Sequence, residues 1–149
     1  MKVIDIMTKD PVTCNEKQTV SDAAKLMAEE GFSVMLIVND DGALVGIVTE
    51  SDFVGKEIEI PHALASLKRV LGENHYHGDI EEIYHNAKNR SLSEVMTEQP
   101  VFVGPQESLN DVVNKMNAKK LKRLPVVEDG KLVGIVTRKD LIKAFNKID

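Results

Sequence analysis

Two segments of the chain could bind a ligand, because each has a threonine followed three residues later by an aspartate. They are Gly46–Asp52 and Gly134–Asp140, and in both an apolar strand is expected to lead into a helix. A helix N-terminus presents unpaired N–H groups and the positive end of the helix dipole, which favour an anion. The threonine hydroxyl can donate to a phosphate or ribose oxygen, and the two oxygens of an ionised aspartate can accept from both hydroxyls of a ribose.

The same pattern has a purely structural interpretation. A threonine and an aspartate at this spacing, at the start of a helix, resemble a capping box. The N-cap alone contributes about 0.5–2 kcal/mol to stability. From the residues alone, Thr49–Asp52 and Thr137–Asp140 are therefore either ligand-binding residues or helix caps.

Both segments belong to a longer internal repeat. The segment Met7–Val12, with its Met-Thr and Pro-Val pairs, recurs 89 residues later as Met96–Val101. The segment Leu44–Asp52 recurs 88 residues later as Leu132–Asp140. The repeat has thus lost one residue in the Asp-Gly turn between these segments, where an intact repeat tolerates a deletion.

Each copy predicts the same order of elements: a short extended segment, an amphipathic helix, two strands joined by an Asp-Gly turn, and a second helix. Apolar residues of the first helix recur at i, i+3, i+4 and i+7, and Thr19 and Ser108 suit its N-cap. The Asp-Gly turn is typical of a hairpin. We expect an α/β (α+β) fold, a pseudo-two-fold sandwich of two small α/β units. Its predicted parts are residues 1–53, a helical insert at 54–90, and residues 91–149.

The insert is not explained by the repeat. Pro61–Leu71 and Asp79–Asn89 each predict a short helix, and the insert is a lid, a dimer contact or an ordinary connector. His75, His77 and His85 lie close in sequence, but without cysteine support they do not predict a metal site. We expect no metal.

The composition excludes several classes of protein. The 149 residues include one cysteine, Cys14, so no internal disulfide can form. The longest apolar run is Val34–Val38, far shorter than the roughly 20 residues that span a bilayer. A net charge of −5 argues against general nucleic-acid binding, although residues 113–149 carry a balance of +6 that could attract a phosphate. Without an apolar leader at the N-terminus, we expect a cytoplasmic protein with no membrane contact.

The order of these motifs resembles the CBS motif, named after cystathionine β-synthase, and two such motifs in tandem form a Bateman module. The resemblance covers residues 1–53 and 91–146. It implies a regulatory module that binds AMP, ADP, ATP or a related adenosine ligand in the cleft between the repeats. It also implies that the threonine and the aspartate of each turn contact the ligand, which assigns this role to Thr49, Asp52, Thr137 and Asp140. The family often has Ser or Thr just before the aspartate, where Ser51 matches and Lys139 does not.

The two copies predict unequal sites. Lys122 and Arg123 match a family pattern in which a basic pair reaches the ligand's phosphates, whereas Ser33 and Val34 stand there in the first copy. Arg138 and Lys139 add two cations beside the second turn. An arginine can bind phosphate through two hydrogen bonds, which favours the second copy as the source of phosphate contacts. The alternative is that Lys122 and Arg123 only cover the end of a helix.

The resemblance also assigns the adenine contacts. The ring is expected against the residues after each Pro-Val pair and against the strands that flank them. These residues are Thr13, Cys14, Phe102, Val103, Ile47 and Ile135. Core packing alone would also explain these apolar side chains.

The residues leave two function classes open and make a third improbable. The first is a ligand-sensing regulatory module, and the second is a ligand-free module whose repeats build a dimer surface and regulate a partner protein. Because the apolar stripes exceed what one unit can cover, we expect a homodimer. An enzyme is not expected, since no nucleophile, base and orienter set and no Walker A or Gly-x-Gly-x-x-Gly loop occurs in the sequence.

Overall fold

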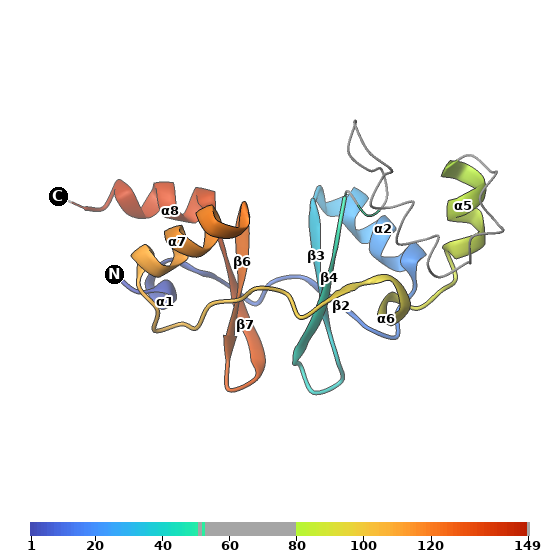
Figure 1. The fold of residues 1–149 in the computed structure, drawn as a ribbon, viewed down its shortest axis with the longest axis horizontal. Helices are drawn as coiled ribbons and strands as arrows, with labels where there is room; N and C mark the ends of the chain where they lie inside the picture. Colours follow the sequence, from blue (N-terminus) through green and yellow to red (C-terminus); the bar gives the residue numbers. More distant parts are fainter. Residues whose placement is uncertain (51, 53–79, 149) are drawn as a thin grey trace. The chain divides into compact units, whose positions relative to one another are not determined.

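A computed structural model describes residues 1–50, residue 52 and residues 80–148 (Figure 1). The chain divides into two compact units. The C-terminal unit comprises Met1–Val12, Asp41–Leu44 and Val101–Asp149, and the N-terminal unit comprises Thr13–Asp40 and Val45–Pro100. Each unit is a mixed α/β structure with its own sheet, so the predicted fold class is confirmed.

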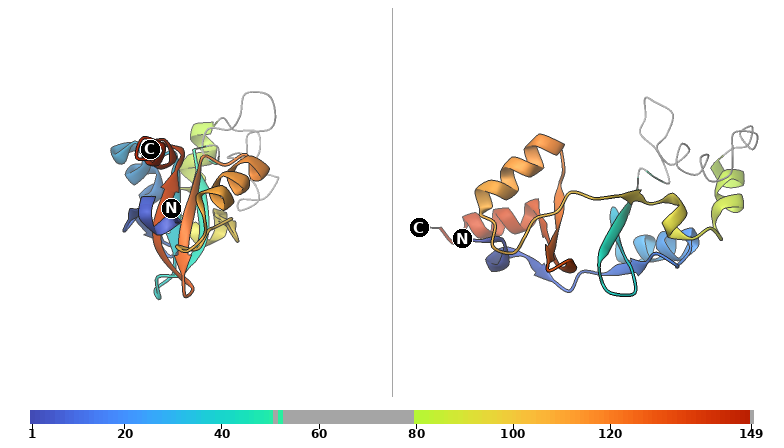
Figure 2. Two further views of the ribbon diagram at one scale, coloured as in Figure 1. Left: turned by 90° about the vertical axis from the view of Figure 1, so that its left-hand side faces the viewer. Right: turned by 60° about the horizontal axis from the view of Figure 1, so that its bottom comes forward.

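The C-terminal unit is built on a three-stranded antiparallel sheet in the order β1-β7-β6. Its helices α7 and α8 lie beside the β6–β7 hairpin, and the short N-terminal helix α1 contacts α8 (Figure 2). The bounds are α1 Val3–Ile6, β1 Thr8–Lys9, α7 Leu109–Lys119, β6 Arg123–Glu128, β7 Lys131–Thr137 and α8 Arg138–Phe145.

The N-terminal unit has a four-stranded sheet in the order β2-β3-β4-β5. Strand β2 is parallel to β3, and β5 is antiparallel to β4. The bounds are β2 Thr13–Asn15, α2 Val20–Glu30, β3 Val34–Val38, β4 Leu44–Thr49, α5 Ile80–Ala87, α6 Leu92–Val95 and β5 Thr97–Glu98.

The short Met-Thr strand at the start of each copy pairs with the hairpin of the other copy. In the C-terminal unit, Thr8 of β1 lies opposite Ile135 of β7. In the N-terminal unit, Thr97 of β5 lies opposite Ile47 of β4. The compact units and the sequence repeats therefore do not coincide, because each unit takes its edge strand from the other repeat.

This pairing of each edge strand with the hairpin of the other copy explains why a glycine begins both Gly-Ile-Val-Thr segments. A Cβ atom on Gly134 would lie 2.8 Å from Met7 Sδ and 2.9 Å from the carbonyl oxygen of Thr8. A Cβ atom on Gly46 would lie 2.5 Å from Met96 Sδ. Only glycine admits the crossing strand at these distances, so the Met-Thr motif and the glycine form one packing unit in each half.

We expect Gly134→Ala to lower the free energy of unfolding by about 1 kcal/mol or more, because the carbonyl of Thr8 must move to admit the methyl group. Denaturant unfolding would measure the loss. Gly104→Ala is the matched control, since its Cβ would meet no atom closer than 3.7 Å. Equal stability of the two variants would contradict the packing argument.

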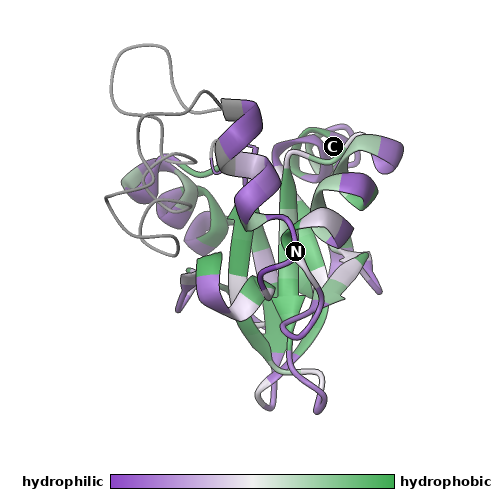
Figure 3. Ribbon diagram, turned by 90° about the vertical axis from the view of Figure 1, so that its right-hand side faces the viewer, coloured by the Kyte–Doolittle hydropathy of each residue, from purple (hydrophilic) through white to green (hydrophobic). Residues whose placement is uncertain are grey.

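The buried apolar residues form one aliphatic cluster in each unit. Figure 3 shows hydrophobic residues concentrated in the strands, while the helices carry hydrophilic residues on part of their surface. Val20, Ala23 and Met27 of α2 are buried, which confirms the helical stripe of the first copy. Cys14 is only 1% exposed in this core, and burial raises the pKa of its thiol.

The helix starts predicted for α2 and α7 are confirmed as reciprocal caps. Ser108 Oγ accepts from the backbone N–H of Asp111, and an Asp111 carboxylate oxygen accepts from the N–H of Ser108, both at 3.1 Å. Hydrogen bonds to the carboxylate from the backbone and then the side chain of Ser108 lower the pKa of Asp111. Thr19 and Asp22 make the same pair of bonds at the start of α2.

The other expected elements are confirmed only in part. The extended segment of the first copy is strand β2, whereas in the second copy only Val103 forms a bridge, parallel to Val126. The helix expected at Asp79–Asn89 is α5. The helix expected at Pro61–Leu71, and most of the one expected near Ser51, lie outside the described residues. No helix in the described part of the chain has the length and apolarity to cross a membrane.

Candidate functional site

The threonine and aspartate at the start of α8 form a capping box, as the structural interpretation predicted. Asp140 Oδ2 accepts from the backbone N–H of Thr137 at 2.9 Å and from the Thr137 hydroxyl at 3.1 Å. In return, Thr137 Oγ1 lies 3.2 Å from the backbone nitrogen of Asp140, whose N–H it accepts. Thr137 is thus the N-cap of α8.

Capping occupies only one of the two carboxylate oxygens. Within the described ranges, Asp140 Oδ1 accepts no hydrogen bond, and the residue is half-buried. The second oxygen of an ionised carboxylate can accept two further hydrogen bonds. The two interpretations of the motif are therefore compatible, because Oδ2 caps the helix while Oδ1 keeps its acceptor capacity.

The first copy makes the same two hydrogen bonds to its aspartate. Asp52 Oδ2 accepts from the backbone N–H of Thr49 at 2.8 Å and lies 3.2 Å from its hydroxyl oxygen. Both residues are half-buried. Ser51, which was also predicted to contact the ligand, lies outside the described residues.

The cations of the second copy gather at one end of the β6–β7 hairpin, beside Thr137. Arg123 lies directly opposite Thr137 in the antiparallel register, and the N–H of Arg138 donates to the carbonyl of Lys122 at 3.1 Å. Lys122, Arg138 and Lys139 are exposed, and Arg123 is half-buried. The fold thus places four predicted phosphate contacts around one helix start: Lys122, Arg123, Arg138 and Lys139.

The equivalent end of the N-terminal unit lacks these charges. There the N–H of Glu50 donates to the carbonyl of Ser33 at 2.9 Å, which is the same backbone bond in the first copy. Glu50 and Ser33 therefore replace Arg138 and Lys122, and Val34 replaces Arg123. Because an acidic side chain stands where the other unit has arginine, this end is much less favourable for a phosphate.

The predicted adenine contacts differ in how accessible they are. Cys14 and Val103 are buried in the two cores, so their side chains pack as the structural alternative proposed. The peptide groups of Val103 are also used, since its N–H donates to Pro125 and its carbonyl accepts from Val127. Thr13, Ile47 and Ile135 are half-buried, whereas Phe102 is 50% exposed.

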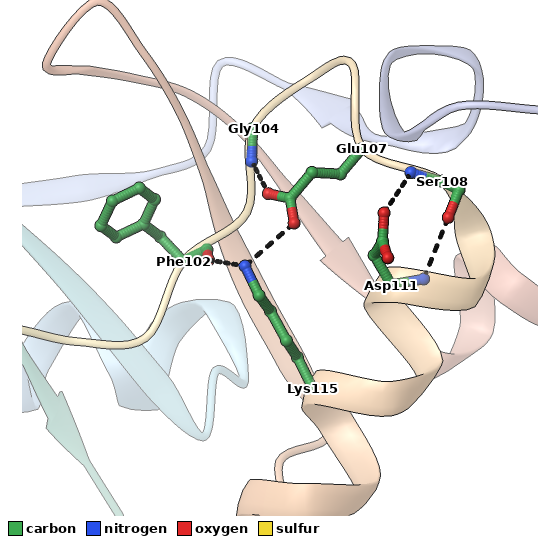
Figure 4. Close-up of polar contacts among 6 residues, drawn as sticks. All are labelled: Phe102, Gly104, Glu107, Ser108, Asp111 and Lys115. Atoms are coloured by element: carbon green, nitrogen blue, oxygen red, sulfur yellow. Dashed lines mark hydrogen bonds and ion pairs between the residues drawn. The ribbon is translucent and has the colours of Figure 1, made fainter.

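Sequence reasoning missed the contact of Lys115 with the backbone of Phe102. Lys115 donates to the carbonyl of Phe102 at 3.1 Å and pairs with Glu107 at 3.0 Å (Figure 4). The pair is separated by eight positions and joins a loop to a helix, so no helical spacing indicates it. Only the fold brings these charges beside a predicted ligand contact.

A hollow of about 400 Å³ on the N-terminal unit contains none of the predicted site residues. Its lining includes Glu94 and Glu98, two carboxylates that disfavour a phosphate. In the part of the chain that the structure describes, no group of three metal-ligating side chains occurs. Of the described residues, the start of α8 with its four cations is therefore the strongest candidate for binding an anion.

Two similar halves, each with a hairpin, an amphipathic helix and a capped Thr-x-x-Asp turn, define a tandem-repeat α/β module. The family model for the CBS domain matches residues 3–59 and 92–147. The chain belongs to the CBS domain family. The protein MJ1426 of Methanocaldococcus jannaschii is 34% identical over 158 residues, which cover 97% of this chain and 91% of that protein.

Solved CBS structures share this fold. CBSX2 in complex with AMP is 26% identical and has a TM-score of 0.72, with coverage of 98% of this chain and 96% of that one. The CBS domain pair of protein MJ0100, in complex with 5′-methylthioadenosine and S-adenosyl-L-methionine, is 28% identical with a TM-score of 0.69. That match covers 99% of this chain and 97% of the domain pair.

Proposed function

We propose that this protein is a regulatory module that senses an adenine nucleotide: AMP, ADP or ATP. The observation that carries the proposal is the start of α8, where the second oxygen of Asp140 is still able to accept hydrogen bonds beside Arg123 and three exposed cations. A ribose presents two hydroxyl donors and a phosphate presents anionic oxygens, so this arrangement complements both parts of a nucleotide.

Each part of the ligand has a proposed partner. Asp140 accepts from the ribose hydroxyls, and Thr137 orients that carboxylate through its two hydrogen bonds. Lys122, Arg123, Arg138 and Lys139 contact the phosphates, while the exposed ring of Phe102 packs against adenine. We propose Thr49, Ser51 and Asp52 as contacts of a second, weaker site, where Ser33, Val34 and Glu50 stand in place of three of the cations.

The bound structures in the family support an adenosine-type ligand, since AMP, 5′-methylthioadenosine and S-adenosyl-L-methionine share adenine and a ribose with free 2′ and 3′ hydroxyls. The choice among them rests on charge. S-adenosyl-L-methionine and 5′-methylthioadenosine carry no phosphate, so the four cations around Thr137 favour a phosphorylated ligand instead.

A thermal-shift assay tests this proposal directly. A ligand that binds only the folded state raises its stability, so saturating AMP, ADP or ATP should raise Tm by several degrees. Inorganic pyrophosphate at the same concentration controls for unspecific anion binding. The absence of a shift with all three nucleotides, or an equal shift with pyrophosphate, would contradict nucleotide sensing.

A second proposal concerns assembly, which a ligand-free interaction module would also require. Ile142 and Phe145 of α8 are exposed, at 60% and 49%, and Ile148, three residues beyond the end of the helix, is also exposed. Helix α1, which contacts α8, adds exposed Ile4, and exposed Met1 precedes this helix. We infer that these exposed apolar residues pair with a second copy to form a homodimer, because apolar residues gathered on a protein surface mark interaction sites.

Light scattering at tens of micromolar is expected to give the mass of a dimer. Ile142→Asp places a charge within the apolar surface and should shift the protein towards monomer. Asn146→Asp, which adds the same charge at an exposed position without removing apolar area, is the control. A monomeric wild-type protein would contradict the dimer.

As a regulator, the module would act on a partner protein in the cytoplasm and have no catalytic activity of its own. Nucleotide binding would change the module's affinity for that partner. By linkage, the partner would change the affinity for the nucleotide by the same factor.

A further inference from the structure

A single ammonium group links the Phe102 segment to helix α7. Glu107 Oε2 accepts from the backbone N–H of Gly104 at 2.5 Å, and Glu107 Oε1 pairs with Lys115 Nζ at 3.0 Å (Figure 4). The same ammonium donates to the carbonyl oxygen of Phe102 at 3.1 Å. Lys115 therefore contacts both ends of the turn that follows Phe102.

The first copy builds the same turn without charges. There the N–H of Asn15 donates to Gln18 Oε1 at 2.8 Å, and these residues precede Gly104 and Glu107 by 89 positions. Leu26 occupies the position of Lys115. A neutral Gln–Leu pair thus replaces the Glu–Lys pair, which means that the ion pair is not required for the turn itself.

The ion pair is also poorly placed to stabilise the fold. The side chains of Lys115 and Glu107 are 39% and 30% exposed. Ion pairs with this degree of solvent access contribute little to stability. What Lys115 adds over Leu26 is therefore a fixed position for the Phe102 carbonyl.

Apart from Lys115, the backbone near Phe102 is held by the hydrogen bonds of the next residue, Val103, with strand β6. Val103 donates to the carbonyl of Pro125 at 3.0 Å and accepts from the N–H of Val127 at 2.9 Å, so both of its peptide groups face β6. In an extended chain the peptide groups of the preceding residue point the opposite way. The carbonyl of Phe102 therefore faces Lys115, and its ring remains half exposed.

We propose that Lys115 is a positioning residue for base recognition: by holding the Phe102 carbonyl, it fixes the backbone and the ring against which adenine packs. This inference rests on the proposed nucleotide-sensing function and adds a residue to that site. Lys115 touches the ligand at no point in this scheme, so its effect should be the same for ligands with and without phosphates.

The test replaces Glu107 and Lys115 with the residues at the equivalent positions of the first copy, in the double variant Glu107→Gln/Lys115→Leu. The turn should survive, because glutamine can accept from Gly104 as Gln18 does from Asn15, and Tm should stay within a few degrees of wild type. The Kd values of AMP and of adenosine should both rise, by about fivefold and to the same extent. Glu107→Gln alone, which leaves Lys115 on Phe102, should bind as wild type.

Calorimetric titration of AMP and adenosine separates the outcomes. Unchanged Kd values in the double variant would overturn the positioning role while leaving nucleotide sensing intact. A loss of affinity for AMP but not for adenosine would also overturn the positioning role, because Lys115 would then be a phosphate contact. If the double variant does not fold, Lys115→Met provides the same comparison. A wild-type protein that binds neither ligand would refute nucleotide sensing itself, and this inference with it.

Discussion

Asp140→Asn should weaken nucleotide binding about tenfold or more while leaving helix α8 capped, because a hydrogen bond to a charged group contributes about 1.5–3 kcal/mol. The asparagine oxygen can still accept from Thr137, as Asp140 Oδ2 does at 2.9 Å. What disappears is the charge and the second acceptor oxygen. Calorimetric titration with AMP, together with denaturant unfolding of the unliganded protein, measures both effects.

The chain contains its own control for this substitution. Asp111 makes the same reciprocal cap with Ser108 at the start of α7 and has no proposed ligand contact. Asp111→Asn and Asp140→Asn should therefore have similar, small effects on stability, under about 1 kcal/mol. Only Asp140→Asn should lower affinity. An unchanged Kd in Asp140→Asn would leave capping as the only role of this carboxylate.

Much of the fold was predictable because its signals are local. The apolar stripe of α2, the Asp-Gly hairpins and the caps at Thr19 and Ser108 each depend on residues within one or two turns of chain. The two-copy architecture followed from repetition of these signals. The extended segment before α7 was harder to predict, since in that copy only Val103 pairs with β6.

The exchange of edge strands had no sequence signal. Strands β1 and β5 have two residues each, too few for a periodic pattern. The partner of β1 lies far away along the chain, because Thr8 faces Ile135. Gly134 and Met7 were both visible as repeated residues, but nothing in the sequence indicated that one packs on the other.

The sequence predicted which residue types form the candidate site. It did not predict that the two carboxylate oxygens of Asp140 differ in their hydrogen bonds. Sequence reasoning treated capping and ligand binding as alternatives, because it could not assign separate roles to Oδ1 and Oδ2 of Asp140. Hydrogen-bond geometry assigns capping to Oδ2, and among the described residues Oδ1 accepts no hydrogen bond. The contact of Lys115 with Phe102 was missed for a related reason, since it depends on how a loop meets a helix.

Arg123→Ala should weaken binding of AMP, ADP and ATP by about tenfold or more, and binding of adenosine much less. Arg123 lies opposite Thr137 across the hairpin, beside the proposed ribose contact, and we propose that its guanidinium binds the ligand's phosphate through two hydrogen bonds. Charge-assisted hydrogen bonds of this kind contribute about 1.5–3 kcal/mol. Adenosine has no phosphate and cannot gain that energy.

Lys131→Ala is the matched control for charge, because Lys131 is an exposed cation at the other end of the same hairpin, opposite Glu128. If the effect of Arg123 were only a change in long-range potential, both variants would weaken AMP binding to a similar degree and both effects would fade with salt. A specific contact predicts a large loss in Arg123→Ala alone. Arg123→Lys should recover only part of the affinity, since an ammonium keeps the charge but cannot form the paired hydrogen bonds. Equal losses of adenosine and AMP affinity in Arg123→Ala would refute the phosphate contact.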